Sequence, residues 1–235
     1  DLNGKRYSQL SPALRNVFDT VSLNCVYFTD VTDHEVTEIM RRLNNGKFLT
    51  GQERVRIRAK DLAGIQRLAK HEMLRTALSP AKINGYKDED AVVKLYLLLI
   101  DRNMSFEKKD IDDAYRTMVV THEVYDEIQY VLDFMLSTYR TMLEHGGRKA
   151  ARKFTTRTHL ITLAPLFQQA MLDRRDDQYM TAFLKHFFNG APSIHKQYNL
   201  ACQGGTNHAT MVCARVNGVL DEYRKFEPKD QPDDD

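Results

Sequence analysis

The sequence predicts a mainly α-helical protein, a multi-helical array that follows a short α/β element at the N-terminus. Two observations predict this class. From Thr32 onward, apolar residues recur at helical spacing between turns that contain Gly or Pro. Before that point, residues 21–29 show the alternation of a strand. We divide the chain into a partial α/β element over 1–60, a helical domain over 61–227 and a disordered acidic tail over 228–235.

Length and composition are those of a soluble globular protein. The chain has 235 residues, of which 42% are hydrophobic and 28% charged, so it can bury a sizeable core. No apolar run approaches the ~20 residues that span a bilayer. Cys25, Cys202 and Cys213 have no short paired spacing, and the histidines show no ligand pattern. We therefore expect a cytoplasmic protein with no membrane contact, no disulfide framework and no metal site.

The first 32 residues combine a brief helix with a strand. Pro12 follows Ser11 at the start of the helix, where Pro is favoured. Residues 21–29 (VSLNCVYFT) are rich in β-branched and aromatic side chains and predict a strand. Because one strand cannot form a sheet, its partner would be residues 5–7, another subunit or a segment that precedes this chain.

Two Thr-x-x-Glu capping boxes, at residues 32–35 and 50–53, predict the starts of the next two helices. The apolar face of the first helix consists of Val36, Ile39, Met40 and Leu43. Arg41 and Arg42 leave this face. An Asn-Asn-Gly turn at 44–46 follows. The packed stripe of the second helix consists of Val55, Ala59 and Leu62, which leaves Arg54 and Arg58 one turn apart on another face.

The remainder of the chain is predicted to be helical. The expected helices cover residues 62–78, 88–102, 109–118, 121–145, 157–172, 177–189 and 206–226. Pro165 lies inside an apolar pattern and is expected either to kink its helix or to start a new one.

The net charge of +2 conceals an uneven distribution of charge. Residues 41–75 contain ten Lys/Arg and three Asp/Glu, whereas residues 101–133 contain four Lys/Arg and nine Asp/Glu. The first segment could bind an anionic ligand, or the two segments could neutralise each other.

Two sets of residues are candidates for contact with phosphate groups. The first set surrounds the Asn-Asn-Gly turn and consists of Arg42, Asn44, Lys47, Arg54 and Arg58. The second set follows Gly146-Gly147, has no acid among its members and consists of Arg148, Lys149, Arg152 and Lys153. The alternative for the first set is a left-handed helix cap with a solvated or salt-bridged basic face. For the second set it is an exposed helix edge.

The run MRRLNNGKFLT at 40–50 resembles the GmrSD-like family, whose N-terminal part has a ParB/sulfiredoxin-like fold. Arg42, Asn44, Gly46 and Leu49 match its Arg-Leu-Asn-x-Gly-x-x-Leu pattern, and Met40 stands where Phe is usual. The resemblance covers roughly residues 1–60. It implies that the α/β element is a remnant of a ParB/sulfiredoxin-like sheet. The family's catalytic Asp-Gly-Gln-Gln-Arg-like motif is absent from this sequence, so the resemblance gives this chain no catalytic element.

The resemblance also implies a partner and a biological setting. Family members act in DNA restriction and nucleotide hydrolysis, which suggests DNA or a nucleotide as partner. It also suggests a nucleoside triphosphate with Mg²⁺ as cofactors of a longer form. We therefore expect a nucleic-acid- or nucleotide-associated protein of bacterial or phage origin that binds phosphate through a basic helix-turn-helix surface. The alternative is a non-catalytic helical module that docks on a protein partner or on a second copy of itself.

Overall fold

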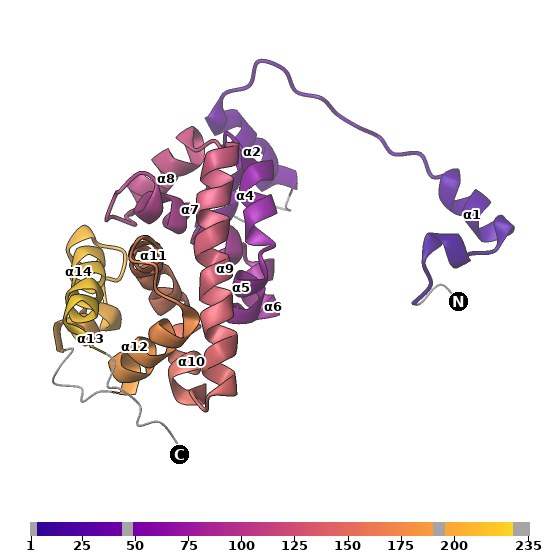
Figure 1. Cartoon of the computed structure of the whole chain (residues 1–235). Helices are drawn as coiled ribbons and strands as arrows, with labels where there is room; N and C mark the ends of the chain where they lie inside the picture. Colours follow the sequence, from indigo (N-terminus) through magenta and orange to yellow (C-terminus); the bar gives the residue numbers. More distant parts are fainter. Residues whose placement is uncertain (1–3, 44–48, 190–195, 228–235) are drawn as a thin grey trace.

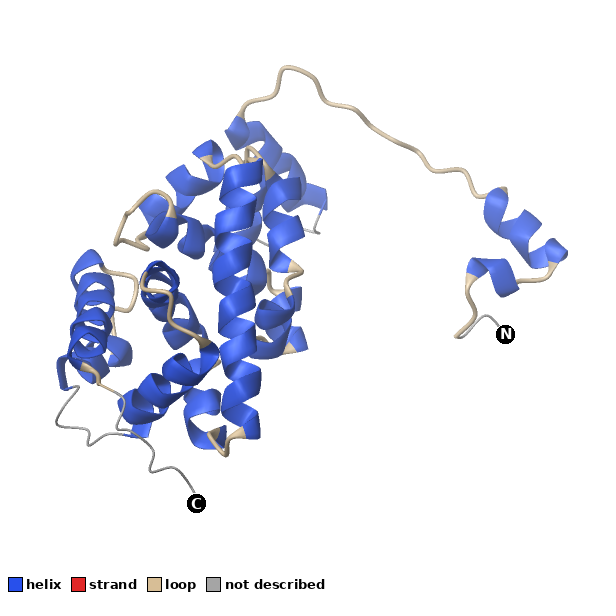
Figure 2. Cartoon of the chain, viewed as in Figure 1, coloured by secondary structure: helices blue, strands red, loops and turns tan. Residues whose placement is uncertain are grey.

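The computed structural model describes residues 4–43, 49–189 and 196–227, without the side chains of Asp33, Arg41 and Lys196. These residues form fourteen α-helices and one short 3-10 helix, and no strand occurs among them (Figures 1 and 2). The prediction of a mainly α, multi-helical array is therefore confirmed. The predicted tail over 228–235 lies outside the described residues, and the division into domains stays a prediction.

The helices follow one another along the chain, and a long extended segment, residues 20–32, joins α1 to α2 (Figure 1). In order they are η1 Tyr7–Gln9, α1 Pro12–Asp19, α2 Asp33–Leu43, α3 Gly51–Ile57, α4 Leu62–Ala69, α5 Glu72–Ala77, α6 Pro80–Asn84, α7 Lys87–Leu99, α8 Lys108–Thr117, α9 His122–Glu144, α10 Arg148–Phe154, α11 Arg157–Leu172, α12 Asp177–Asn189, α13 Lys196–Gln203 and α14 Ala209–Lys225.

Two helices organise the core. In α7, 11 of the 13 residues are buried, and α4, α8, α9 and α11 pack around it. The 23-residue α9 is about 35 Å long at 1.5 Å per residue and forms the spine on which α5, α10 and α12 lie (Figure 1). On the far side of α11, α14 packs against α11 and α13. The result is one continuous apolar core that runs from Val55 in α3 to Tyr223 in α14.

Both capping boxes are confirmed. The Thr32 backbone N–H donates to Glu35 Oε2 at 2.8 Å, and the Glu35 N–H donates to Thr32 Oγ1 at 3.3 Å. The same reciprocal pair joins Thr50 and Glu53 at the start of α3. These hydrogen bonds satisfy backbone donors that the first turn of a helix leaves unpaired.

The prediction of a strand over residues 21–29 is wrong. These residues are extended, belong to no ladder and are exposed to solvent. Strand-like side chains alone cannot create a strand, because its backbone groups must pair with a second strand. Among the described residues no second strand is present.

Three helices also differ from their predicted bounds by more than one residue. One is α7, which ends at Leu99 rather than at 102. The helix expected over 62–78 is two helices, because the His71 Nδ1 atom accepts the Met73 N–H at 3.1 Å and starts α5 there. The terminal helix begins at Ala209 rather than at 206. Pro165 does not start a new helix: α11 continues through it, with its predicted bounds. Three short helices, α6, α10 and α13, were not predicted.

Candidate nucleic-acid interface

The structure describes only part of the first set of residues predicted to contact phosphate groups. Asn44 and Lys47 lie outside the described residues. Arg42, at the end of α2, has a side chain that is 74% exposed, and its Nε atom lies 2.9 Å from Glu38 Oε1 one turn earlier. Arg42 is therefore on the surface, but its charge is shared with a neighbouring carboxylate in a pair that contributes little stability.

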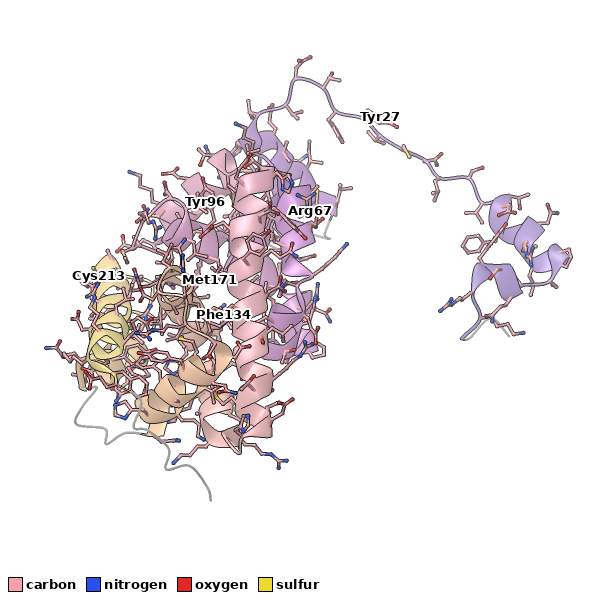
Figure 3. All side chains as sticks on the ribbon, viewed as in Figure 1. Tyr27, Arg67, Tyr96, Phe134, Met171 and Cys213 are labelled. Atoms are coloured by element: carbon pink, nitrogen blue, oxygen red, sulfur yellow. The ribbon has the colours of Figure 1, made fainter. Side chains whose placement is uncertain are left out.

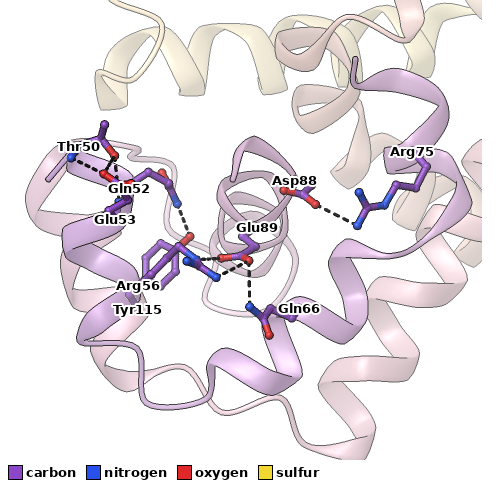
Figure 4. Close-up of polar contacts among 9 residues, drawn as sticks. All are labelled: Thr50, Gln52, Glu53, Arg56, Gln66, Arg75, Asp88, Glu89 and Tyr115. Atoms are coloured by element: carbon purple, nitrogen blue, oxygen red, sulfur yellow. Dashed lines mark hydrogen bonds and ion pairs between the residues drawn. The ribbon is translucent and has the colours of Figure 1, made fainter. Parts of the chain in front are cut away.

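Helix α3 separates its three arginines into different environments. Arg54 is exposed, whereas Arg58 is half-buried at the C-cap. Arg56, between them, points inward: its Nε and Nη2 atoms lie 2.6 and 3.2 Å from the two carboxylate oxygens of Glu89 (Figure 4). Its guanidinium carbon also lies 3.7 Å from the centre of the Tyr86 ring. Within α3, Arg54 is therefore the residue best placed to meet a ligand.

Glu89 belongs to a buried ionic cluster, which we define as Asp88, Glu89 and Asp90 with their cationic partners. The three carboxylates lie in the first turn of α7, where the helix dipole stabilises negative charge. Each has a partner on another helix. The ion pairs are Arg75–Asp88 at 3.3 Å, Arg56–Glu89 at 2.6 Å and Arg157–Asp90 at 3.5 Å, with Lys94–Asp90 at 3.1 Å within α7.

Burial shifts the pKa values of two polar side chains in and beside the ionic cluster, Lys94 and Tyr115. Desolvation lowers the pKa of Lys94, an effect that Asp90 partly opposes. Burial, followed by the charges of Asp90 and Glu89, raises the pKa of Tyr115, whose hydroxyl accepts a 2.5 Å hydrogen bond from Gln52 Nε2 (Figure 4). Because every carboxylate of the cluster is paired with a cation, the cluster fastens α3 and α5 to α7. Sequence reasoning missed it, because a Lys-Asp-Glu-Asp run at a helix start is typical of a solvated first turn.

The second predicted set of phosphate ligands occupies α10. Arg148, Lys149 and Arg152 are exposed. The opposite side of the helix packs into the core through Ala150, Ala151 and Phe154. The Phe154 ring stacks on Phe167 with centroids 5.6 Å apart, so it is not available for stacking on a base.

Lys153 has a different role from the other cations of α10. Its Nζ atom donates a 2.6 Å hydrogen bond to the Phe188 carbonyl at the end of α12. Lys185, from the same helix, donates to the His145 carbonyl at 3.2 Å. These two bonds join α12 to α10 and to the end of α9, where basic side chains gather. We call His145, Arg148, Lys149, Arg152, Lys153 and Lys185 the basic corner.

A tight Gly-Gly turn sets the direction of α10. Gly146 has φ +73°, a backbone conformation that residues other than glycine rarely adopt. Gly147 donates its N–H to the Met142 carbonyl at 2.8 Å, and a Cβ atom at this position would lie 2.5 Å from Met142 Cγ. The turn therefore brings α10 back beside the end of α9. Residues 145–157, which contain this turn and α10, include no Asp or Glu.

An open cavity of ≈ 1100 Å³ adjoins the basic corner, between α9, α12 and the end of α14. His145 and Lys185 belong both to the corner and to the cavity wall. The wall also contains three carboxylates, Asp176, Glu222 and Glu227. This mixture of charges makes the cavity less suitable for a polyanion than the outer face of α10.

The predicted residues do not form one site. Helix α2, with Arg42, lies near the N-terminal end of α9, and α10 follows its C-terminal end (Figure 1). The structure brings Arg148, Lys149 and Arg152 together on one exposed face. It places Arg42 in a separate region, at the other end of the spine.

A buried polar group around Arg215 was not predicted as a site. The guanidinium donates to Thr162 Oγ1, the Ala201 carbonyl and the Thr206 carbonyl at 3.1, 2.7 and 2.6 Å. Nearby, His159 Nδ1 lies 2.7 Å from the Tyr198 hydroxyl. Burial, with Lys153 and Arg215 close by, lowers the pKa of His159 to about 4. The group connects α11, α13 and α14, and we assign it to the scaffold.

The described residues form neither a candidate metal site nor a membrane-spanning helix. Within the part of the chain that the structure describes, no three His, Cys, Asp or Glu side chains are grouped so that they could hold a metal ion. None of the described helices is long and apolar enough to cross a membrane. The chain matches no protein-family model, no curated protein and no solved structure.

Proposed function

We propose that this chain binds nucleic acid through the phosphate backbone, with the basic corner as its contact surface. The observation that carries the proposal is the asymmetry of α10. One side of this helix is fixed in the core by Ala150, Ala151 and Phe154, while Arg148, Lys149 and Arg152 face solvent. The fixed side gives the three exposed cations a rigid support. Residues 145–157, which contain α10, carry four Lys/Arg besides Lys153 and have no Asp or Glu among them.

The chemistry of the basic corner favours the backbone over the bases. Lys and Arg neutralise phosphates without reading sequence, and they release counterions when they do so. The one aromatic residue of α10, Phe154, is buried, which does not fit a stacking platform for single strands. A duplex is therefore the ligand class that fits best. Restriction or phage defence, which the GmrSD-like resemblance of residues 40–50 suggests, is the setting we propose for it.

Salt dependence tests this proposal quantitatively. The measurement is fluorescence anisotropy of a labelled DNA duplex over a series of salt concentrations. The slope of log K against log salt is about −0.9 for each phosphate neutralised. We expect Arg148→Ala/Lys149→Ala/Arg152→Ala to weaken binding and to make this slope less steep by about 2.7.

The matched control removes three exposed cations elsewhere. Lys82 in α6 and Lys108 and Lys109 in α8 are exposed, and the last two lie beside Asp110, Asp112 and Asp113. Lys82→Ala/Lys108→Ala/Lys109→Ala changes the net charge equally and should leave the slope near that of the unmodified protein. Binding that is absent, independent of salt, or weakened equally by both triple variants would refute the proposal.

The alternative function, a module that docks on protein, is favoured by a different observation. The N-terminal segment that precedes α2 extends away from the helical body and exposes large apolar side chains (Figures 1 and 3). Such a segment is expected to be covered by another surface in the assembled protein.

A further inference from the structure

The apolar N-terminal segment is the most exposed part of the described chain. We define residues 17–31 as the arm. The exposed large side chains of the arm are Val17, Phe18, Val21, Leu23, Val26, Tyr27, Phe28 and Val31. Leu23 and Tyr27 are 84% and 88% exposed, and Tyr27 is seen on the extended part of the chain in Figure 3. Single exposed apolar residues are ordinary, but a contiguous group of this size indicates an interaction surface.

The extended part of the arm has the pattern of a strand with one apolar face. Side chains in a strand alternate between faces, so one face carries Val21, Leu23, Cys25 and Tyr27. The other face begins with Ser22 and Asn24 and continues with Val26 and Phe28. The arm is already extended, and it lacks only a partner strand. No strand exists among the described residues of the helical body, so the body offers no sheet edge to which the arm could add.

We propose that the arm pairs with the arm of a second copy of this chain in an antiparallel two-stranded ribbon. A two-fold axis at Asn24 places Val21 opposite the partner's Tyr27, and Leu23 opposite the partner's Cys25. Because facing residues of an antiparallel pair lie on the same side, all four apolar residues of each arm then form one continuous surface. A register shifted by one residue would set this face against the mixed one, which disfavours it.

Charge does not oppose this association. Residues 4–31 contain three cations, Lys5, Arg6 and Arg15, and two carboxylates, Asp19 and Asp30. Residues 4–31, which include the arm, therefore carry a net charge of only +1 in each copy. The arm also projects away from the helical body (Figure 1), which leaves room for a second body at the other end of the ribbon.

Helix α1 supplies the cover that a two-stranded ribbon needs. A ribbon of two strands is marginal in water unless its apolar face packs against another element. The residues before the extended part of the arm fold into a small unit. In it, the Tyr7 hydroxyl lies 2.7 Å from Asp19 Oδ2 and the Tyr7 ring contacts Phe18 at 5.9 Å between centroids. The exposed Val17 and Phe18 of this unit directly precede Val21. One α1 from each copy could cover the shared apolar face.

The exposed apolar area of the paired faces approaches that of a small specific interface. Tyr27 on the apolar face and Phe18 on the covering helix are 88% and 64% exposed. At 150–250 Å² for each aromatic side chain, these two expose roughly 230–380 Å² per copy. Two copies double this area to roughly 460–760 Å², and Val17, Val21 and Leu23 of each copy add to it. The total approaches the ~1,200 Å² of the smallest specific interfaces, which fits a dimer of modest affinity.

Sedimentation equilibrium of the whole chain tests this proposal. We expect dimers that form as concentration rises between about 1 µM and 1 mM. Leu23→Asp places a charge in the apolar face and should weaken association at least about tenfold. Ser22→Asp adds the same charge on the opposite face and should dimerise like the unmodified chain. Circular dichroism of both variants should be unchanged, because the arm lies outside the core. A chain that stays monomeric, with its arm free for a foreign sheet edge, would overturn the proposal.

Crosslinking at Cys25 gives a second, independent measurement. In the proposed register the two Cys25 side chains are diagonal neighbours about 7–8 Å apart, within reach of a short bis-maleimide. Cys202 and Cys213 are half-buried and would be replaced, as Cys202→Ala/Cys213→Ala, so that Cys25 alone reacts. A covalent dimer that disappears with Leu23→Asp supports the pairing. A dimer that Leu23→Asp leaves intact, or that Cys25 cannot crosslink, would place the interface elsewhere and refute it.

Discussion

The buried ion pair between Arg56 and Glu89 leads to a prediction about stability. In Arg56→Met the aliphatic stem is kept and the guanidinium is lost. The Glu89 carboxylate, in a residue only 5% exposed, would then face the neutral Gln66 amide at 3.3 Å. A buried charge that loses its partner costs about 3–5 kcal/mol. The lost contact between Arg56 and the Tyr86 ring adds to this destabilisation. We therefore expect Arg56→Met to lower the free energy of unfolding by about 3–5 kcal/mol.

Two further variants identify the cause of that loss. Arg56→Met/Glu89→Leu removes both charges, so no unpaired carboxylate remains, and we expect it to recover most of the stability. Arg54→Met removes an exposed arginine two residues earlier in the same helix. It should change the free energy of unfolding by no more than about 0.5 kcal/mol.

Urea unfolding followed by far-ultraviolet circular dichroism measures these differences, since the helical content is high and the chain has no Trp. A loss below about 1 kcal/mol in Arg56→Met would be that of a surface ion pair. Such a result would refute the role of the ionic cluster in fastening α3 to α7. A double variant as unstable as Arg56→Met would show that packing, rather than the unpaired charge, dominates.

Three other predictions follow from single contacts. Gly147→Ala should destabilise the fold by about 1–3 kcal/mol in thermal melting, because the new Cβ would lie 2.8 Å from the Met142 carbonyl oxygen. The control is Gly204→Ala, whose Cβ would have nothing within 4 Å. Asp61→Ala should lower the free energy of unfolding by about 2–3 kcal/mol, because the Asp61 carboxylate accepts hydrogen bonds from the N–H groups of Gly64 and Val120, both at 2.9 Å. An unchanged urea midpoint would contradict this. His159 should make stability depend on pH, because its pKa is about 4 when folded and near 6.5 when unfolded. The unfolded chain therefore binds the proton first, and stability should fall by up to roughly 3 kcal/mol as pH drops from 6.5 to 4. His159→Gln should lack this part of the slope in denaturant titrations at several pH values.

The sequence was most informative where local signals and tertiary packing agree. The bounds of α11 and α12 were predicted at 157–172 and 177–189, and the structure has the same bounds. Both are apolar segments ended by turn residues. The capping boxes at Thr32 and Thr50 were also read correctly, because a cap is a purely local arrangement.

The errors arose where structure depends on distant parts of the chain. Residues 21–29 have the composition of a strand, but a strand also needs a neighbour, which no local pattern can supply. Arg54 and Arg56 look equivalent in sequence, yet one is exposed and the other is bound to Glu89, 33 positions away. The exposed cations of α10 were recognised as a group, but the helix that presents them was not. Its short face of Ala150, Ala151 and Phe154 is buried only because α10 packs against α9 and α12, and these contacts are not visible in the local sequence.

The shielding of the ionic cluster has a practical consequence. Dissolved ions weaken attraction between charges that water reaches, but they act much less on pairs excluded from solvent. The Arg56–Glu89 pair that holds α3 on α7, with side chains 19% and 7% exposed, should therefore persist in concentrated salt, while any polyanion on the open face of α10 dissociates. Ionic strength thus becomes a selective reagent for this molecule: it detaches the ligand and leaves the framework intact.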